Sequence, residues 1–274
     1  MKKQLHRISK KQISLLTGLL AVAVLLMVAA KTCSAPGVYD SRHKPSGGDT
    51  VDVAIEYGPL SLYRYNDTLG GFAYDFIRHI EASAGLPVKF HPVMTLSEAL
   101  EGIDEGYYRM AVAAMPLSAS LSRNYASTVP VFLDRQVYVQ MLDDSGKVEV
   151  RTQLDLACRT VHVMSGSPVA ERLRNLASEI GDTIYVVEDS EYGNEQLFIL
   201  AATGEIPGAV VTERTAKALA ADYPRADIST AVSFTQFQSW LLGRNDTILL
   251  HRIDSIIESE KSKRFYKGLE KRYF

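Results

Sequence analysis

The chain has 274 residues, of which 46% are hydrophobic and 23% are charged, and its formal net charge is -2. This composition is typical of a globular protein, and the length allows either one large domain or two smaller lobes. A nearly neutral chain offers no electrostatic footprint for a polyanion, so we expect no nucleic-acid partner.

The N-terminal segment differs in charge from the rest of the chain. Residues 1–39 contain Lys and Arg side chains but no Asp or Glu. Within this segment, residues 13–30 carry no charge, and as a helix they would span about 27 Å, close to the thickness of a hydrocarbon core. The basic residues 1–12 would stay in the cytoplasm, so the chain after residue 30 would be exported.

Three fates of residues 13–30 are open. We favour an uncleaved, single-pass membrane anchor with the folded domain in the periplasm, because the apolar run is longer than the roughly 7 to 15 residues of a signal peptide. Cleavage after the small residues 28–30 would instead give a periplasmic protein. Lipidation of Cys33 is the third possibility, although Lys31 and Thr32 are poor residues before a lipoprotein cysteine.

The pattern after residue 30 predicts a linker followed by alternating strands and helices. Residues 31–50 are rich in Ser, Gly and Pro, as flexible linkers are. The folded part then begins near Val51. In the first half, the periodicity predicts strands over residues 51–57, 86–93 and 109–115, and helices over 74–85 and 95–106, with Thr95 or Ser97 as the N-cap of the second helix.

The second half repeats this order. Strands are predicted over residues 158–166 and 183–189 and helices over 168–181 and 194–204, and residues 208–223 contain a further strand followed by a helix. The alternation predicts parallel sheets in an α/β fold with two lobes. We expect lobe 1 to comprise residues 51–135 plus 231–274 and lobe 2 residues 136–230, with the chain crossing between them near 134–140 and 231–236.

Five strings in the correct order carry a resemblance to a known family. They are the loop of residues 57–61, the helix start of residues 71–75, the stretch of residues 113–123 ending in Arg123, the pair Gly166 and Ser167, and the terminal residues 265–274. Together they resemble the type 2 periplasmic solute-binding proteins of the amino-acid-binding family, over about residues 51–274. The resemblance implies that a small ligand binds between two lobes.

Two further strings are similar to a particular branch of that family. Residues 56–61 and 233–240 look most like the non-catalytic N-terminal module of membrane-bound lytic murein transglycosylase F. Those enzymes carry a lysozyme-like domain after the module. We find neither its Glu-Ser motif nor the Gly-Leu-Met-Gln pattern that follows it, so we expect a binding module and no enzyme.

The resemblance implies roles for particular residues. Arg123 would hold the ligand carboxylate as a bidentate guanidinium, with Ser118 as an additional donor. Gly166 and Ser167 would direct backbone N–H groups at an anion, and Ser167 could equally be an ordinary helix cap. Tyr57 would cover the apolar part of the ligand or pack between the lobes.

One position departs from the family pattern. Family members usually place an Asp after the second-lobe strand to pair with the ligand ammonium, and Thr212 stands there instead. The adjacent Glu213 cannot be assumed to replace it, because neighbouring side chains point in different directions. We therefore expect a small carboxylate-bearing solute, amino-acid-like or a cell-wall peptide fragment, without a strong requirement for an ammonium group.

Two other functions are also compatible with the sequence. A regulatory or scaffold module of cell-wall metabolism that has lost its small ligand is the main alternative, and a cyclohexadienyl dehydratase-like enzyme with an acid such as Glu56 is a weaker one. The six histidines are scattered and no metal or cofactor motif is present. We expect no cofactor, and we expect Cys158 to be a half-buried free thiol. The membrane, a permease or a cell-wall enzyme are the expected partners.

Overall fold

The computed structural model describes residues 49–274. The expected membrane segment, residues 13–30, and nearly all of the expected linker lie outside the described residues. Among the helices of residues 49–274, none combines the length and the apolar character needed to cross a membrane.

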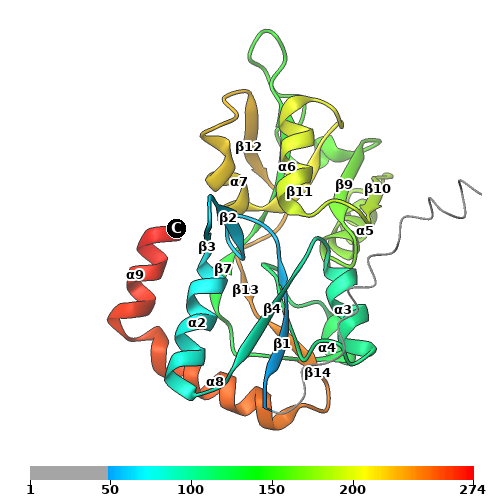
Figure 1. Ribbon diagram of the computed structural model, residues 1–274. Coiled ribbons are helices and arrows are strands. Elements are labelled where there is room, and N and C mark those ends of the chain that lie inside the picture. Colours follow the sequence, from blue (N-terminus) through cyan, green and yellow to red (C-terminus); the bar gives the residue numbers. More distant parts are fainter. Residues whose placement is uncertain (1–48) are drawn as a thin grey trace, which may run out of the picture. The chain divides into compact units, whose positions relative to one another are not determined.

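Two five-stranded sheets form the centres of two lobes (Figure 1). The sheet of lobe 1 has the order β4 (Val88–Val93), β1 (Val51–Glu56), β5 (Met110–Val112), β14 (Leu241–Gly243) and β6 (Tyr125–Ser127). The sheet of lobe 2 has the order β10 (Tyr185–Asp189), β9 (Thr160–Met164), β11 (Ala209–Thr212), β8 (Gln136–Met141) and β12 (Ala226–Ala231). The two-lobed α/β fold expected from the sequence is therefore observed.

The helices follow the strands in the expected order. Lobe 1 contains α2 (Phe72–Ala84), α3 (Leu96–Asp104), α4 (Ala119–Asn124), α8 (Thr247–Lys261) and α9 (Arg264–Tyr273). Lobe 2 contains the 3-10 helix η1 (Gln153–Leu156) and the helices α5 (Val169–Ile180), α6 (Asn194–Thr203) and α7 (Glu213–Ala220). Strands β2 (Tyr63–Tyr65) and β3 (Thr68–Gly70) form a hairpin in lobe 1.

Each sheet is mixed, so the expected parallel pairing is found for only three strands of each sheet. Strands β4, β1 and β5 are parallel, as are β10, β9 and β11. The antiparallel partners are β14 and β6 in lobe 1 and β8 and β12 in lobe 2. Strands β8 and β14 enter their sheets after the chain has crossed from the other lobe, so they are not joined to their neighbours by β-α-β crossovers.

The two crossings meet in a small sheet between the lobes. Strand β7 (Phe132–Asp134) leads out of lobe 1 and β13 (Gln236–Gln238) leads back, and the two pair antiparallel. Figure 1 shows β7 and β13 between the two larger sheets. A pair of short strands is a suitable hinge, because few backbone dihedrals connect the two lobes.

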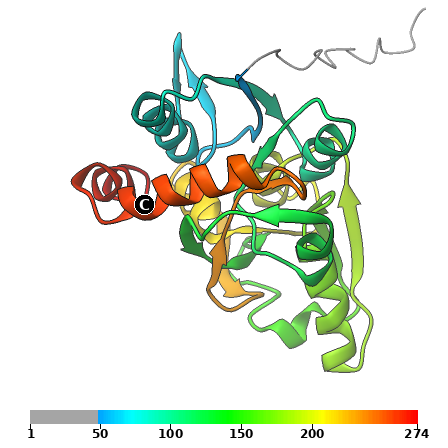
Figure 2. The ribbon, with the colours of Figure 1, turned by 90° about the horizontal axis from the view of Figure 1, so that it is seen from below.

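Burial along β1 explains how lobe 1 is layered. Val51, Val53 and Ile55 belong to an apolar cluster with α2, α8 and α9 on one face of the sheet. Ala54 points to the other face, against α3, as the two-residue period of a strand requires. Helices α8 and α9 (orange and red in Figure 2) thus close one side of the sheet, and the carboxyl end of β1 is directed at the other lobe.

Local capping follows the sequence, with one correction. The Thr95 hydroxyl accepts a hydrogen bond from the Glu98 N–H, so Thr95 is the N-cap of α3, and Gly85 ends α2 in a left-handed conformation. Cys158 is a free thiol, but it is exposed and not half-buried. The reason is local: Cys158 has a positive φ of 58° in the turn before β9, and its thiol faces Asp182 at the surface.

Candidate functional site between the lobes

A buried hydrogen bond joins the lobes at the carboxyl end of β1. Glu56 is the last residue of β1 and Asn194 is the first residue of α6. The Glu56 Oε1 accepts a hydrogen bond from the Asn194 Nδ2 at 2.6 Å, and the Glu56 Oε2 accepts one from the Ala114 N–H at 3.2 Å. Both side chains come from residues that are only 6% exposed. The carboxylate is therefore satisfied by the protein itself.

The space around this pair is lined from both lobes but is filled. Its lining includes Gly58, Ser61 and Ala114 from lobe 1, and Glu195 and Thr215 from lobe 2, and it leaves no room for a water molecule. Burial raises the pKa of Glu56, against the opposing effect of the hydrogen bond from Asn194. Burial also raises the pKa of Glu195. This inner part of the interface is acidic and closed.

An open cavity of about 200 Å³ lies in the outer part of the same interface. Lobe 1 contributes residues 116–119, and α5 of lobe 2 contributes Glu171, Arg172 and Asn175 together with the preceding Pro168. The hinge region supplies Gln136, Ser233 and Gln236. Because both lobes and both crossings line it, opening of the hinge would take this cavity apart.

The polar groups of the cavity are partly connected to each other. The Ser118 and Ser120 hydroxyl oxygens lie 2.7 Å apart, and the Ser120 hydroxyl donates a hydrogen bond to the Glu171 Oε2 at 2.9 Å. On the same helix as Glu171, the Arg172 Nη1 donates to the Glu179 Oε1 at 2.7 Å and its Nε donates to the Val232 carbonyl at 3.4 Å. The cavity thus has a carboxylate and a guanidinium in its wall.

Close backbone approach between the lobes depends on glycine. Gly166 has a φ of +77°, and a Cβ atom on it would lie 2.6 Å from the Ser97 backbone nitrogen in lobe 1. Beside it, the Ser97 N–H and hydroxyl donate hydrogen bonds to the Ser165 carbonyl and hydroxyl. A Cβ atom on Gly193 would lie 2.5 Å from the Met94 carbonyl oxygen. The lobes are closed on each other at both points.

The structure brings only part of the predicted site to the cavities. Ser118 lines the outer cavity and is also the N-cap of α4, accepting a hydrogen bond from the Leu121 N–H. Tyr57 is half-buried in the loop after β1, and it lines neither cavity. Arg123 is exposed in the last turn of α4 and lines neither cavity. Its contact with a ligand therefore stays a prediction.

The second-lobe candidates have internal roles. The Ser167 hydroxyl accepts a hydrogen bond from the Val169 N–H at the start of α5. Thr212 is buried and caps α7, with its hydroxyl donating to the Thr215 hydroxyl at 2.8 Å. Glu213 pairs with Arg135 and Lys217, and the hydrogen bond from Arg135 lowers its pKa. Contact of Gly166, Ser167 and Thr212 with a ligand remains a prediction.

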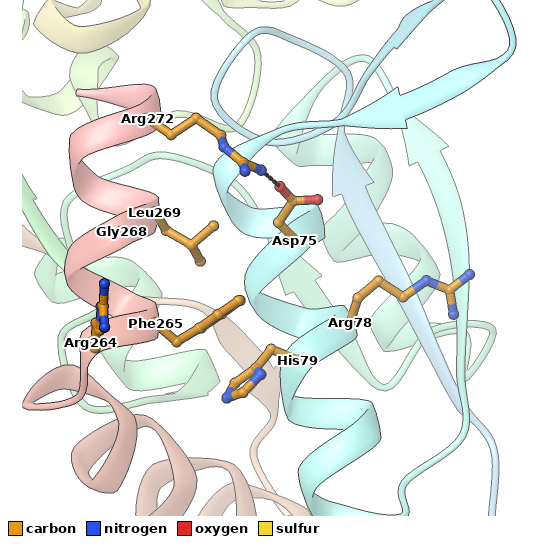
Figure 3. Close-up of a pocket in the computed structure, with 8 residues that line it drawn as sticks. All are labelled: Asp75, Arg78, His79, Arg264, Phe265, Gly268, Leu269 and Arg272. Carbon is orange, nitrogen blue, oxygen red and sulfur yellow. Dashed lines mark hydrogen bonds and ion pairs between the residues drawn. The ribbon is translucent and has the colours of Figure 1, made fainter.

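A separate groove of about 690 Å³ lies between α2 and α9 in lobe 1. Figure 3 shows Arg272 of α9 reaching Asp75 of α2, while Arg78 and Arg264 point away from the gap between the helices. The His79 and Phe265 rings stack within it at a centroid distance of 3.9 Å. Its contacts join the terminal helix to lobe 1, so we do not place the functional site there.

Sequence reasoning missed the residues that dominate both cavities. Glu56 was considered only as a possible acid of an enzyme, and Asn194, Glu171 and Arg172 were not considered. A signal existed for Glu56: a charged residue ends a strand directly after the apolar residues 53–55, at the edge of a sheet where α/β proteins bind ligands. Helix α5 gave no comparable signal, because Glu and Arg are also ordinary residues of a solvated helix.

The chain is similar in sequence to a family of solute-binding proteins and to several longer curated relatives. The family described as bacterial extracellular solute-binding proteins, family 3, matches residues 50–274. Curated relatives include membrane-bound lytic murein transglycosylase F of Ectopseudomonas mendocina, 22% identical over 94% of this chain and 52% of the relative. The corresponding protein of Aeromonas hydrophila is 24% identical over 82% of this chain and 44% of the relative. The chain thus spans about half the length of these relatives.

Solved structures share the fold. An ancestral arginine-binding protein bound to arginine superposes with a TM-score of 0.70 at 19% identity, covering 83% of this chain and 99% of that one. A putative L-cystine ABC transporter protein from Listeria monocytogenes gives a TM-score of 0.71 at 17% identity, covering 82% of this chain and 96% of that one. At such identities the likeness establishes the fold alone.

Proposed function

Because the chain belongs to family 3 of the bacterial extracellular solute-binding proteins, we propose that it binds a small carboxylate-bearing solute between its two lobes. The observation that carries this proposal is the outer cavity, which both lobes and both hinge strands line. A solute there would bridge the lobes and favour the closed form over an open one. We propose an amino-acid-like molecule or a cell-wall peptide fragment.

Calorimetry on the full-length protein in detergent tests the function. The probes are the L-amino acids, D-alanine and short cell-wall peptides. We expect at least one probe to bind with a heat that titrates to one site per chain. Native mass spectrometry of the freshly purified protein is the independent check, because a co-purified small molecule would reveal the ligand class. If no probe binds and no molecule co-purifies, the proposed function is wrong.

A regulatory role in cell-wall metabolism is the second candidate. The matched relatives are membrane-bound lytic murein transglycosylases F, and side chains of both lobes, Glu56 and Asn194 among them, fill the inner part of the interface. In this case the lobes would contact a protein partner such as a cell-wall enzyme. A chain that binds no probe but is retained by an immobilised lytic transglycosylase would support this candidate.

The proposal extends to location and use. Residues 13–30 would hold the domain at the cell membrane, with residues 49–274 on the periplasmic side. Delivery to a permease and sensing are both compatible with such an anchor, and we propose no catalysis by this chain itself. Extraction of membranes with alkaline carbonate tests the anchor: a chain released by carbonate is not membrane-spanning.

A further inference from the structure

The outer cavity carries both signs of charge. Among its lining residues, all of which lie in the described part of the chain, Arg172 is the cation and Glu171 is the anion. Both are half-buried and lie on the first turns of α5. A cavity of about 200 Å³ is smaller than the roughly 300 to 1,000 Å³ pockets that hold drug-sized ligands. A fitting ligand is therefore small and dipolar.

The hydrogen-bonding capacity of these two residues is not used up by the protein. Arg172 commits its Nε and Nη1 to Val232 and Glu179. Its Nη2 makes no hydrogen bond within residues 49–274. Glu171 commits its Oε2 to Ser120, while its Oε1 accepts no hydrogen bond from the described residues. Two residues that line one cavity thus keep an unused donor and an unused acceptor, and the bonds already made hold both side chains in place.

Taking solute binding as its premise, we propose that α5 recognises a zwitterionic, amino-acid-sized solute: Arg172 holds its carboxylate and Glu171 holds its ammonium group. This arrangement differs from the one that the sequence suggested, in which Arg123 of lobe 1 grips the carboxylate. It also supplies an acidic partner in place of the Asp that Thr212 replaces. A free amino acid, for whose ammonium group Thr212 provides no charge, then becomes a suitable ligand.

Closure of the lobes explains why one helix can provide both charges. Ser118 and Ser120 of lobe 1 reach the Glu171 side chain, so closure joins the acidic end of the site to lobe 1. Charge-assisted hydrogen bonds inside such a partly desolvated space are about twice as strong as neutral ones. Lobe 2 would select the solute, and lobe 1 would cover it.

The test combines variants of α5 with altered solutes. Calorimetry first identifies the amino acid that binds the full-length wild-type protein most tightly. The variant Arg172→Gln should weaken its binding about 30-fold or more, as expected for loss of a charge-assisted contact to the carboxylate. The carboxamide derivative of the same amino acid should bind wild type and Arg172→Gln equally. In the same way, Glu171→Gln should weaken binding of the amino acid but not binding of its N-acetyl derivative.

Matched controls separate recognition from folding. Arg174→Gln removes an exposed arginine of the same helix, paired with Glu188, and should leave binding unchanged. Arg172→Lys keeps the charge but loses the planar fork, so it should give an intermediate loss. Thermal midpoints of all variants should stay close to that of wild type, and a binding loss explained by unfolding would count as no support.

Three outcomes would overturn the inference. If Arg123→Gln abolishes amino-acid binding while Arg172→Gln does not change it, the carboxylate site is in lobe 1. If the wild-type protein binds cell-wall peptides but no amino acid, the proposed function stands and this inference is wrong. If it binds neither, both are wrong.

Discussion

Asp134 is a buried carboxyl group in the hinge strand β7, and it is only 3% exposed. Burial raises its pKa to about 6 from an ordinary value of 3.8. Its Oδ1 accepts a hydrogen bond from the Arg135 N–H, while its Oδ2 has no partner among the described residues. The nearby Arg214 lowers the pKa and Glu213 raises it, but neither outweighs burial.

We therefore expect Asp134→Asn to stabilise the protein at neutral pH. The folded state binds the proton of Asp134 more tightly than the unfolded state does, so this group favours folding as the pH falls from above 6 towards 4, and its ionisation costs stability above pH 6. The free energy of unfolding of the variant should exceed that of wild type by roughly 2 to 3 kcal/mol at pH 8, and this difference should vanish below about pH 4. Urea denaturation at several pH values measures it.

Asp144→Asn is the control for that series, because Asp144 is fully exposed and pairs with Arg225 only at the surface. Its free energy of unfolding should change by well under 1 kcal/mol at every pH. A gain for Asp134→Asn that is independent of pH would contradict the assignment of the burial cost to its ionised form.

Phe72 illustrates what a single residue allowed us to predict. An apolar residue where a helix begins is expected to be a core residue more than a ligand contact, and Phe72 is fully buried, with edge-to-face contacts to Phe132 and Tyr266. An apolar side chain can be assigned to the core from its pattern alone. For Arg123 or Glu171 the pattern is not enough, because the exposure of a charged helical residue depends on which helix covers it.

The variant Phe72→Ala should cost about 3 to 5 kcal/mol of stability, through lost transfer energy and the cavity that remains. Phe72→Leu, which keeps most of the volume, should cost much less and should leave solute affinity as in wild type. Chemical denaturation gives both values. Phe234→Ala, at an 89% exposed position, is the control and should fall within about 0.5 kcal/mol of wild type.

At the level of elements, the turn before α5 fits lobe 1 so closely that a side chain would not be accommodated. A Cβ atom on Gly166 would meet the Ser97 backbone at 2.6 Å. We expect Gly166→Ala to lower the free energy of unfolding for two reasons, the strain of a positive φ and this clash. Gly181 at the other end of α5 has a similar φ of +72° with open space around it, so Gly181→Ala reports the strain alone.

The difference between these two variants isolates the contact between the lobes. Strain alone is expected to cost about 1 kcal/mol of stability. The loss of stability in Gly166→Ala should be larger than this. The variant should also have a larger radius of gyration, measured by small-angle scattering. Equal values for the two variants, in stability and in size, would mean that the lobes do not close on each other at this turn in solution.

The elements themselves were largely predictable, and their pairing was less so. Helices α2, α3, α5 and α6 fall where the hydrophobic period placed them, because each has a capped start or a glycine at its end. The antiparallel strands β8 and β14 were not foreseen. Their partners lie far away in sequence, and a strand's own residues do not tell which neighbour it will find.

For the whole molecule, the repeated order of strands and helices predicts two lobes. The same pattern does not predict whether the lobes are packed against each other. The apolar cluster that contains Leu96 of lobe 1 continues into Phe198 of lobe 2, so the lobes share buried surface. Whether two lobes meet across water or across packed side chains depends on contacts between segments far apart in sequence. Glu56 and Asn194, 138 positions apart, are the clearest case.

This pair leads to a prediction about lobe closure in the absence of solute. When the lobes separate, Glu56 regains water and its pKa returns towards 4.5, whereas burial raises it in the closed form. The closed form therefore binds the proton more tightly and is favoured as the pH falls, and ionised Glu56 favours opening as the pH rises. The radius of gyration of the solute-free protein should be larger at pH 8 than at pH 5.

Two substitutions test whether Glu56 is responsible for this pH dependence. Glu56→Gln cannot ionise, so its radius of gyration should be the same at both pH values. Asn194→Ala leaves the buried carboxylate without its side-chain donor, which costs about 1 to 3 kcal/mol in the closed form, and this variant should be open at pH 8. Small-angle scattering decides the matter: if Glu56→Gln retains the pH dependence of wild type, another titrating group controls closure.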